Sequence, residues 1–202
     1  MKKRMFSDKF QFTFAVIQGW KTMTSDILPE LGPETELVGT NGKGEFEFRI
    51  GGNYETVAIK PKFKVGEVVA VAQSYHTLNK MGYLAPEWLD HTCESSAGYD
   101  NKMFVRADLM PHQIRIEKVK CELLQEISDE DCIKEGIRRW SDFEDCPKDA
   151  SDTIKNRFGY YGYWYSYAKP TEAFAELINK IFGKNTWERN PYRIAYEFTL
   201  IK

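Results

Sequence analysis

Short segments in which apolar and polar side chains alternate recur along the chain, and this pattern constrains the fold more than any other feature. In residues 45–50 three apolar side chains alternate with Glu and Arg, and residues 192–200 repeat the pattern over nine positions. Strict alternation is typical of a strand with one face in the core. Residues 68–72 lack polar positions, which predicts a strand buried on both faces. We therefore expect a chain rich in β-sheet.

The longest predicted strand covers residues 113–124, and its apolar phase changes near the middle. Ile114 and Ile116 share one phase, whereas the apolar side chains of residues 119–123 share the other. An extra residue in one strand of an antiparallel pair produces such a slip. The sequence therefore predicts a β-bulge near Glu117–Lys118.

Three short helices are expected between the strands. Ser7 can cap a helix over roughly 8–18, although residues 10–14 also alternate, so a strand is the competing interpretation there. Ser128 and Thr171 each precede a further segment with helical periodicity. About six strands and three short helices predict an α+β fold, a small and mostly antiparallel β-barrel with flanking short helices.

Length and composition favour a single domain over residues 1–202. A chain with 42% hydrophobic and 14% aromatic residues can bury a substantial core. Three stretches lack the strand pattern and are expected to be insertions near 27–44, 78–102 and 139–170. The formal net charge of −2 gives no global basic field, so a contact with nucleic acid must rest on a local patch.

The sequence predicts a cytoplasmic protein with no membrane partner and no cofactor. No apolar run approaches membrane-spanning length, and the basic start of the chain lacks the apolar stretch of a secretory signal. The cysteines form no CxxC pair and are expected to be reduced thiols. A zinc site of His91, Cys93 and a distant cysteine matches no common ligand spacing, so no metal site is predicted. The residues concerned are Cys93, Cys121, Cys132 and Cys146, and no catalytic role is assigned to His76, His91 or His112.

Four separated stretches together resemble one family. Residues 15–24 end in Gly-Trp-Lys-Thr-Met-Thr, residues 63–75 contain a Val-Gly-Glu turn before a buried strand, and residues 114–137 and 187–192 follow in the expected order. These stretches are similar to ASCH-domain proteins, many from phages and prophages, whose fold is PUA-like. The resemblance implies a PUA-like barrel that spans the chain between its insertions. Ser25, Asp26 and Gln73 depart from the family pattern, which implies a pocket with different electrostatics.

The opening resembles one branch of the family, small amidohydrolases that remove the acetyl group from N4-acetylcytidine. That resemblance implies that Lys21 and Thr24 are a base and a nucleophile and that Glu135 is the carboxylate. Hydrolysis of an amide needs such groups, because a Thr hydroxyl attacks only when a base takes its proton, and the leaving amine must gain one. Without the resemblance, the three residues are those of an ordinary polar turn and a helix end.

The leading functional hypothesis is binding of a nucleobase-containing ligand, either a nucleoside or a single-stranded nucleic acid, most simply RNA. Trp20 and Tyr75 are candidate stacking residues, and Gln73 and Arg115 are further candidate ligand contacts. The aromatic run at 158–167 is read as packing, a stacking surface or a lid. Hydrolysis of an N4-acylated cytidine is the alternative, and a phage-derived interaction protein without a small ligand is the third. The sequence leaves open whether the chain is an enzyme, which base it binds and its oligomeric state.

Overall fold

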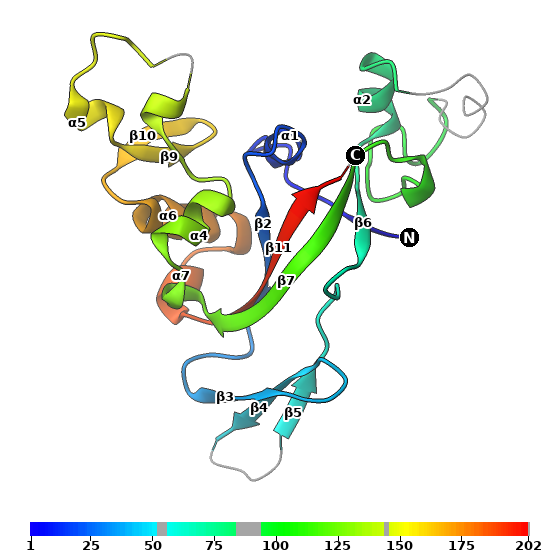
Figure 1. Cartoon of the computed structure of the whole chain (residues 1–202), viewed down its shortest axis with the longest axis vertical. Coiled ribbons are helices and arrows are strands. Elements are labelled where there is room, and N and C mark those ends of the chain that lie inside the picture. The colour runs from blue at the N-terminus through cyan, green and yellow to red at the C-terminus, as the bar shows by residue number, and fades with distance from the viewer. Residues whose placement is uncertain (52–55, 84–93, 144–145, 202) are drawn as a thin grey trace.

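The strand nearest the end of the chain, β11 (Tyr192–Leu200), lies inside the main sheet. In the computed structural model, which describes residues 1–51, 56–83, 94–143 and 146–201, five strands are ordered β1-β6-β7-β11-β2. β11 runs antiparallel to both of its neighbours, whereas β1 pairs parallel with β6. Figure 1 shows this sheet crossing the centre of the molecule. The other four strands are β1 (Lys2–Arg4), β2 (Met23–Leu28), β6 (Val68–Val71) and β7 (Gln113–Leu123).

The predicted β-bulge in the long strand is confirmed. Glu197 of β11 pairs with Lys118, but the next residue, Phe198, pairs with Ile116, so Glu117 is the extra residue in β7. The bulge keeps apolar side chains directed into the core on both sides of the slip, because side chains alternate between faces along a strand. The prediction that residues 68–72 are buried holds from position 69 onward.

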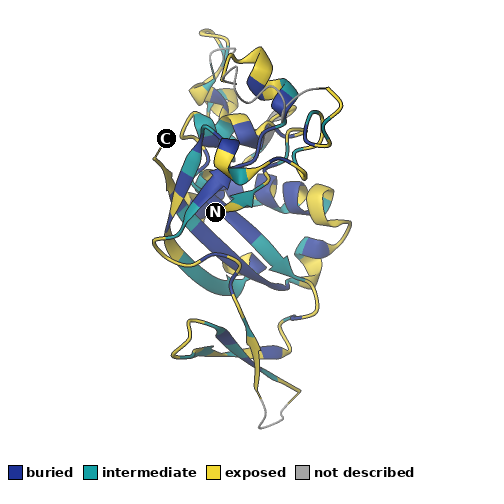
Figure 2. Ribbon diagram, turned by 90° about the vertical axis from the view of Figure 1, so that its right-hand side faces the viewer, coloured by how far each residue is buried: buried dark blue, intermediate teal, exposed yellow. Residues whose placement is uncertain are grey.

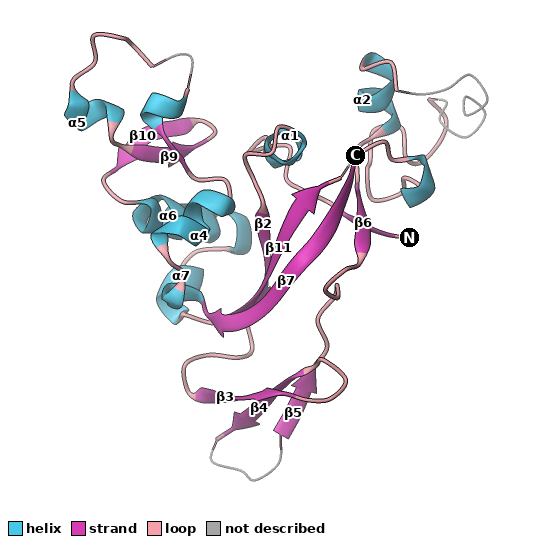
Figure 3. Cartoon of the chain, in the orientation of Figure 1, coloured by secondary structure: helices cyan, strands magenta, loops and turns pink. Residues whose placement is uncertain are grey.

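Two smaller sheets flank the main one, and the described strands do not close into a barrel (Figure 3). The first sheet has the order β3-β4-β5 and lies below the main sheet in the view of Figure 1. The second, β10-β9-β8, is packed against α6. The chain is thus α+β with mostly antiparallel sheets, and the predicted barrel is not confirmed. The strands are β3 (Thr35–Thr40), β4 (Phe46–Ile50), β5 (Thr56–Ile59), β8 (Arg138–Arg139), β9 (Phe158–Tyr160) and β10 (Tyr163–Tyr167).

The helices are short, and two of the three predicted ones form nearly as expected. α4 begins after Ser128, whose hydroxyl accepts a hydrogen bond from the Asp131 amide at 3.1 Å. α6 covers most of the predicted 171–183 segment. The first helix is much shorter than predicted, because residues 8–11 form a turn and Gln11 has a positive φ of 51°. The helices are α1 (Phe12–Ile17), α2 (Tyr75–Lys80), α4 (Asp129–Lys134), α5 (Asp152–Lys155), α6 (Pro170–Phe182) and α7 (Thr186–Arg189).

Two of the predicted insertions contain more regular structure than their sequence suggests. β3 forms within the insertion predicted at 27–44, because residues 35–40 pair antiparallel with β4. β9 and β10 form within 139–170, and Tyr160 of β9 belongs to the main core. Residues 84–93, in the middle of the 78–102 segment, and residues 52–55, which follow β4, lie outside the described residues.

The main core lies between the central sheet and the helices α1, α4 and α6. Figure 2 shows the buried residues concentrated there, and the small sheet β3-β4-β5 is more exposed. Arg193 is fully buried among these side chains, although an alternating strand predicts solvent at its position. In the part of the chain that the structure describes, no helix combines the length and the apolar character needed to cross a bilayer.

Candidate active site

Lys21, Thr24 and Glu135 line the same cavity, which has a volume of about 220 Å³. Each is at least 95% buried. Arg4 and Ser25 line the same cavity, and the apolar wall comes from α6 and the segment before α1. The fold therefore brings together three residues that the resemblance assigns to catalysis, although Glu135 lies more than 110 positions from the other two. Their burial in one cavity differs from the solvated positions of an ordinary polar turn and helix end.

The end of α4 explains how Glu135 reaches this cavity. Gly136 has a φ of 103°, and its amide donates to the Ile133 carbonyl while the Ile137 amide donates to Cys132. These two bonds form a Schellman motif, in which a left-handed glycine ends the helix. A Cβ at Gly136 would lie 3.2 Å from the Phe12 ring, so the tight turn also lets Phe12 approach.

Lys21 is held at the end of α4 by the carboxylate and the backbone of Glu135. Its Nζ lies 2.7 Å from Glu135 Oε2, donates to the Glu135 carbonyl, and lies 4.6 Å from the centre of the Phe12 ring. The carbonyl would otherwise be an unpaired acceptor at a helix end. Burial lowers the pKa of Lys21 below its ordinary value and outweighs the opposing effect of the Glu135 charge. A neutral amine at this position is thus easier to reach than on a surface lysine.

Glu135 also contacts a second buried cation, Arg193. Arg193 Nη1 lies 3.3 Å from Glu135 Oε1 and 2.9 Å from Ser25 Oγ, and Ser25 donates to the same carboxylate oxygen. Burial by itself would raise the pKa of Glu135, but the charges of Lys21 and Arg193 outweigh it, so this pKa lies below its usual value. The carboxylate is therefore ionised at neutral pH.

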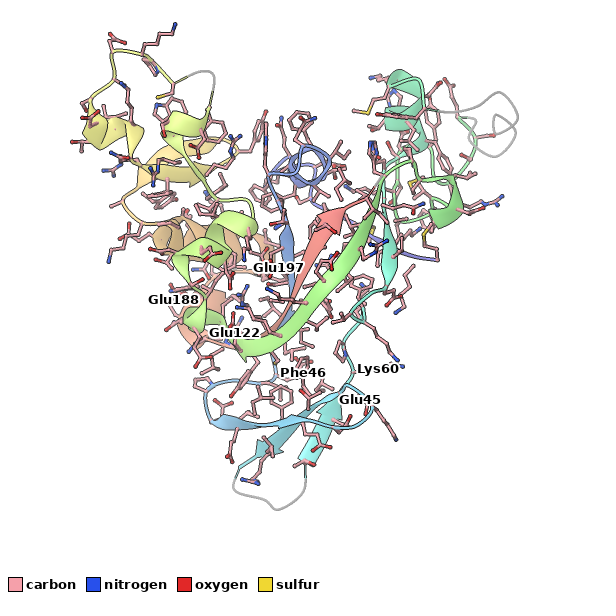
Figure 4. The ribbon with its side chains drawn as sticks, in the orientation of Figure 1. Glu45, Phe46, Lys60, Glu122, Glu188 and Glu197 are labelled. Atoms are coloured by element: carbon pink, nitrogen blue, oxygen red, sulfur yellow. The ribbon has the colours of Figure 1, made fainter. Side chains whose placement is uncertain are left out.

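Arg193 is held from the other side by the neighbouring strand. Its Nη2 and Nε both lie within 3.0 Å of Glu122 Oε1, and Glu122 is the register partner of Arg193 across the β7–β11 pair. In Figure 4, Glu122 on β7 and Glu197 on β11 are both labelled on the side of the sheet toward α4. Glu197 contacts Lys134 of that helix at 3.3 Å. The charges on this face are thus paired rather than solvated.

Thr24 belongs to a different set of contacts from Glu135. Arg4 Nη2 donates to Thr24 Oγ1 at 3.0 Å, and Arg4 Nη1 lies 2.5 Å from Asp26. Because successive side chains of a strand point to opposite faces, Thr24 and Ser25 of β2 diverge, and Ser25 is the residue bonded to Glu135. β2 is an edge strand, so one cavity can reach both faces around its edge.

Three residues of this site were missed in the sequence. Arg4 lies in a basic start that showed no strand pattern, yet it pairs with Val71 in β1–β6. Ser25 was noted only as a departure from a family pattern. Arg193 occupies the polar phase of an alternating strand, and the signal that would have found it is the opposite charge of Glu122 at the paired position. That signal needs the register, which the sequence did not provide.

The two candidate stacking residues do not line this cavity. Tyr75 is 2% exposed, its hydroxyl accepts from the Arg106 amide at 2.8 Å, and a Cβ at Gly98 would lie 2.5 Å from its ring. Its faces are therefore covered by the protein. Trp20 follows the C-terminal end of α1 and is 42% exposed, and the Arg138 guanidinium lies 4.1 Å from the centre of its ring.

Gln73 and Arg115 are also separate from the Lys21 cavity. Gln73 is 2% exposed and lines a different cavity, together with His112. Arg115 is exposed on β7, opposite Val68 and Thr199. The four predicted ligand contacts thus lie at four places, whereas the three predicted catalytic residues lie at one.

Among the described residues no cluster of His, Cys, Asp and Glu has the geometry of a metal site. The zinc hypothesis with His91 and Cys93 lies outside the described residues. Cys121 and Cys132 are free, and burial raises the pKa of Cys121 to about 12, so this thiol is protonated at neutral pH.

Comparison of the chain with family models, with curated proteins and with solved structures found no match. The ASCH resemblance of the four sequence stretches therefore stays a prediction.

Proposed function

We propose that the cavity at Lys21, Thr24 and Glu135 binds a nucleobase-containing ligand and hydrolyses the amide of an N4-acylated cytosine nucleoside. The observation that carries the proposal is the convergence of these three buried side chains on one cavity. The chemistry of the lining agrees with it, because a lysine of lowered pKa and a threonine hydroxyl that face one cavity can act as base and nucleophile toward a substrate bound there. The substrate class rests on the sequence resemblance alone.

In the proposed reaction Lys21 is the base and Thr24 is the nucleophile. The neutral amine of Lys21 takes the Thr24 proton as Thr24 Oγ1 adds to the acyl carbonyl. Collapse of the adduct breaks the C–N bond, and the proton on Lys21 passes to the leaving exocyclic amine. Water then cleaves the acyl ester on Thr24, which releases the carboxylic acid and restores the hydroxyl.

Glu135 serves in this scheme as an acceptor rather than as the acid, because Lys21 and Arg193 keep it ionised. It orients Lys21 through the 2.7 Å contact and offers a counter-charge when Lys21 is protonated. Arg4 donates a hydrogen bond to Thr24 Oγ1, so the Thr24 hydroxyl proton points away from Arg4 and is free to pass to a base. The cavity volume of about 220 Å³ is below that of pockets for whole drug-sized ligands. It suits the base with its acyl group, with the sugar at the mouth.

The test is acetate release from N4-acetylcytidine by the purified protein. Thr24→Ala and Lys21→Ala are each expected to lower turnover by roughly 10³-fold or more, and the double variant should be little worse than either, since the groups act as a unit. Thr40→Ala, a matched change at an exposed position of β3, should retain activity. Turnover should rise with pH as Lys21 loses its proton.

Two results would contradict the proposal. Activity that survives Thr24→Ala but is lost in Ser25→Ala would move the nucleophile to the hydroxyl bonded to Glu135. Binding of N4-acetylcytidine without any acetate release would leave recognition without hydrolysis, which is the second candidate function.

A further inference from the structure

A second cavity, of about 660 Å³, lies between α1, α2 with its flanking residues, and the residue before β7. It shares no lining residue with the cavity at Lys21. Two buried polar side chains form part of its wall, Gln73 at 2% exposure and His112 at 8%. Buried polar groups are normally paired within the protein, so the pairing of these two decides what the cavity offers a ligand.

The contact between Gln73 and His112 fixes the hydrogen-bonding roles of both side chains. Gln73 Oε1 lies 2.7 Å from His112 Nδ1, and a carboxamide oxygen can only accept, so Nδ1 carries the proton. Burial lowers the pKa of His112, which favours the neutral imidazole. In the neutral ring with Nδ1 protonated, Nε2 is an acceptor.

The amide nitrogen of Gln73 is the complementary donor. Among the described residues its contact is the Met81 sulfur at 4.0 Å, and a thioether is a weak acceptor even at short range. The Gln73 amide nitrogen therefore keeps donor capacity for a ligand in this cavity. The cavity therefore presents a donor and an acceptor from adjacent side chains.

The remaining lining determines the charge and shape of the occupant. Phe14, Ile17 and Met81 supply apolar walls. Asp8 is the one charged residue in the described lining, and it forms an ion pair with Lys102 at 2.8 Å. The other polar lining residues are neutral: Gln11, Thr13, Gln18, Thr77 and Tyr83. A site without a lining cation is poorly suited to phosphate, whereas apolar walls with neutral donors and acceptors suit an uncharged aromatic ring.

We infer that this cavity binds an uncharged purine base or nucleoside of the adenine type through Gln73 and His112. Gln73 Nε2 donates to a ring nitrogen of the base, and the exocyclic amine beside that nitrogen donates to His112 Nε2. Glutamine reads adenine through such an adjacent acceptor and donor in other contexts as well. This site is separate from the proposed hydrolysis, and neither depends on the other.

The experiment is isothermal titration calorimetry of the full chain with adenine and with unsubstituted purine. Purine keeps the ring nitrogens but lacks the exocyclic amine, so it should bind about tenfold or more weakly than adenine. This comparison uses the unaltered protein and does not depend on the folding of a variant. Absence of adenine binding at millimolar concentration, or equal affinity for the two compounds, would overturn the inference.

A matched pair of variants assigns the binding to this cavity. Gln73→Glu replaces the donor by an acceptor of the same shape and should weaken adenine about tenfold or more. Gln113→Glu makes the same change next to His112 in the chain, at a position that does not line the cavity, and should leave the affinity within about twofold. Equal affinity of both variants for adenine would place the base elsewhere and overturn the assignment.

Discussion

The two cavities of this protein are built from opposite kinds of polar group. The cavity at Lys21 is lined by charges that are buried and paired, whereas the polar lining of the cavity at Gln73 is neutral apart from Asp8. Buried charges are costly to desolvate and hold one another in fixed geometry, and a lysine of lowered pKa among them can exchange a proton. Neutral groups cost less to bury and discriminate by hydrogen-bond pattern. The difference agrees with the two proposals, proton transfer at the first cavity and recognition of a neutral base at the second.

The largest expected effect comes from removing Arg193, which joins the two halves of the charged cluster. Arg193→Met should lower the free energy of unfolding by about 3–5 kcal/mol, because Glu122 and Glu135 lose their shared cation while Glu135 stays buried. Urea denaturation at pH 7 measures this change.

Arg115→Met is the matched control for that experiment, since Arg115 is exposed on β7. Its effect should be within about 0.5 kcal/mol. Equal stability of the two variants would show that the cluster at Arg193 is solvated in solution, and the contrast between the cavities would then disappear.

A smaller effect is expected when acid removes the contribution of the Glu135 charge to the free energy of unfolding. The pKa of Glu135 is lowered in the folded protein, so its charge stabilises the fold above its unfolded pKa, about 4.3 for glutamate, and this stability is lost as the pH falls through the folded value. Glu135→Gln should therefore be less stable than the unaltered protein at pH 7, and the gap should narrow below pH 4. Denaturation at several pH values measures the gap, and a gap that widens in acid would contradict the assignment.

The smallest change is expected at the neutral cavity and concerns ionisation more than stability. Gln73→Glu places a carboxylate where the amide oxygen now lies 2.7 Å from His112 Nδ1. The new charge should raise the pKa of His112 from its lowered value, because a carboxylate favours the imidazolium. Titration of the His112 ring by NMR follows this, and Gln113→Glu should change it less. A ring that titrates alike in both variants would mean that Gln73 and His112 are apart in solution.

The strand pattern was the most informative part of the sequence, and it failed where pairing rather than burial decides the structure. The bulge at Glu117 was predictable because a change of apolar phase has few other causes. The strand at 35–40 was not, because it is half-exposed and is held by pairing with β4. The predicted barrel depended on which strands become neighbours, and alternation carries no information on that choice.

The candidate site was predictable only where a motif marked it. Lys21, Thr24 and Glu135 followed from a resemblance, and the structure places them together. Arg4 and Arg193 are set by register and by an edge strand that local pattern did not reveal. Tyr75 was expected to stack on a base because aromatic residues do so, but the second core cluster uses the same apolar surface for packing.

The position of β11 between β7 and β2 has a consequence for how the protein folds. Neither neighbour can complete its hydrogen-bonded ladder until residues 192–200 are present, so the central pairing closes loops of about 70 and 170 residues. Contacts so distant in sequence are slow to form, since the loop entropy is lost before the pairing is gained. Arg193 belongs to that strand, so it reaches Glu135 only when β11 pairs. During synthesis the charged cluster therefore assembles in the same late step that completes the sheet, and until then Glu135 lacks one of its two cations.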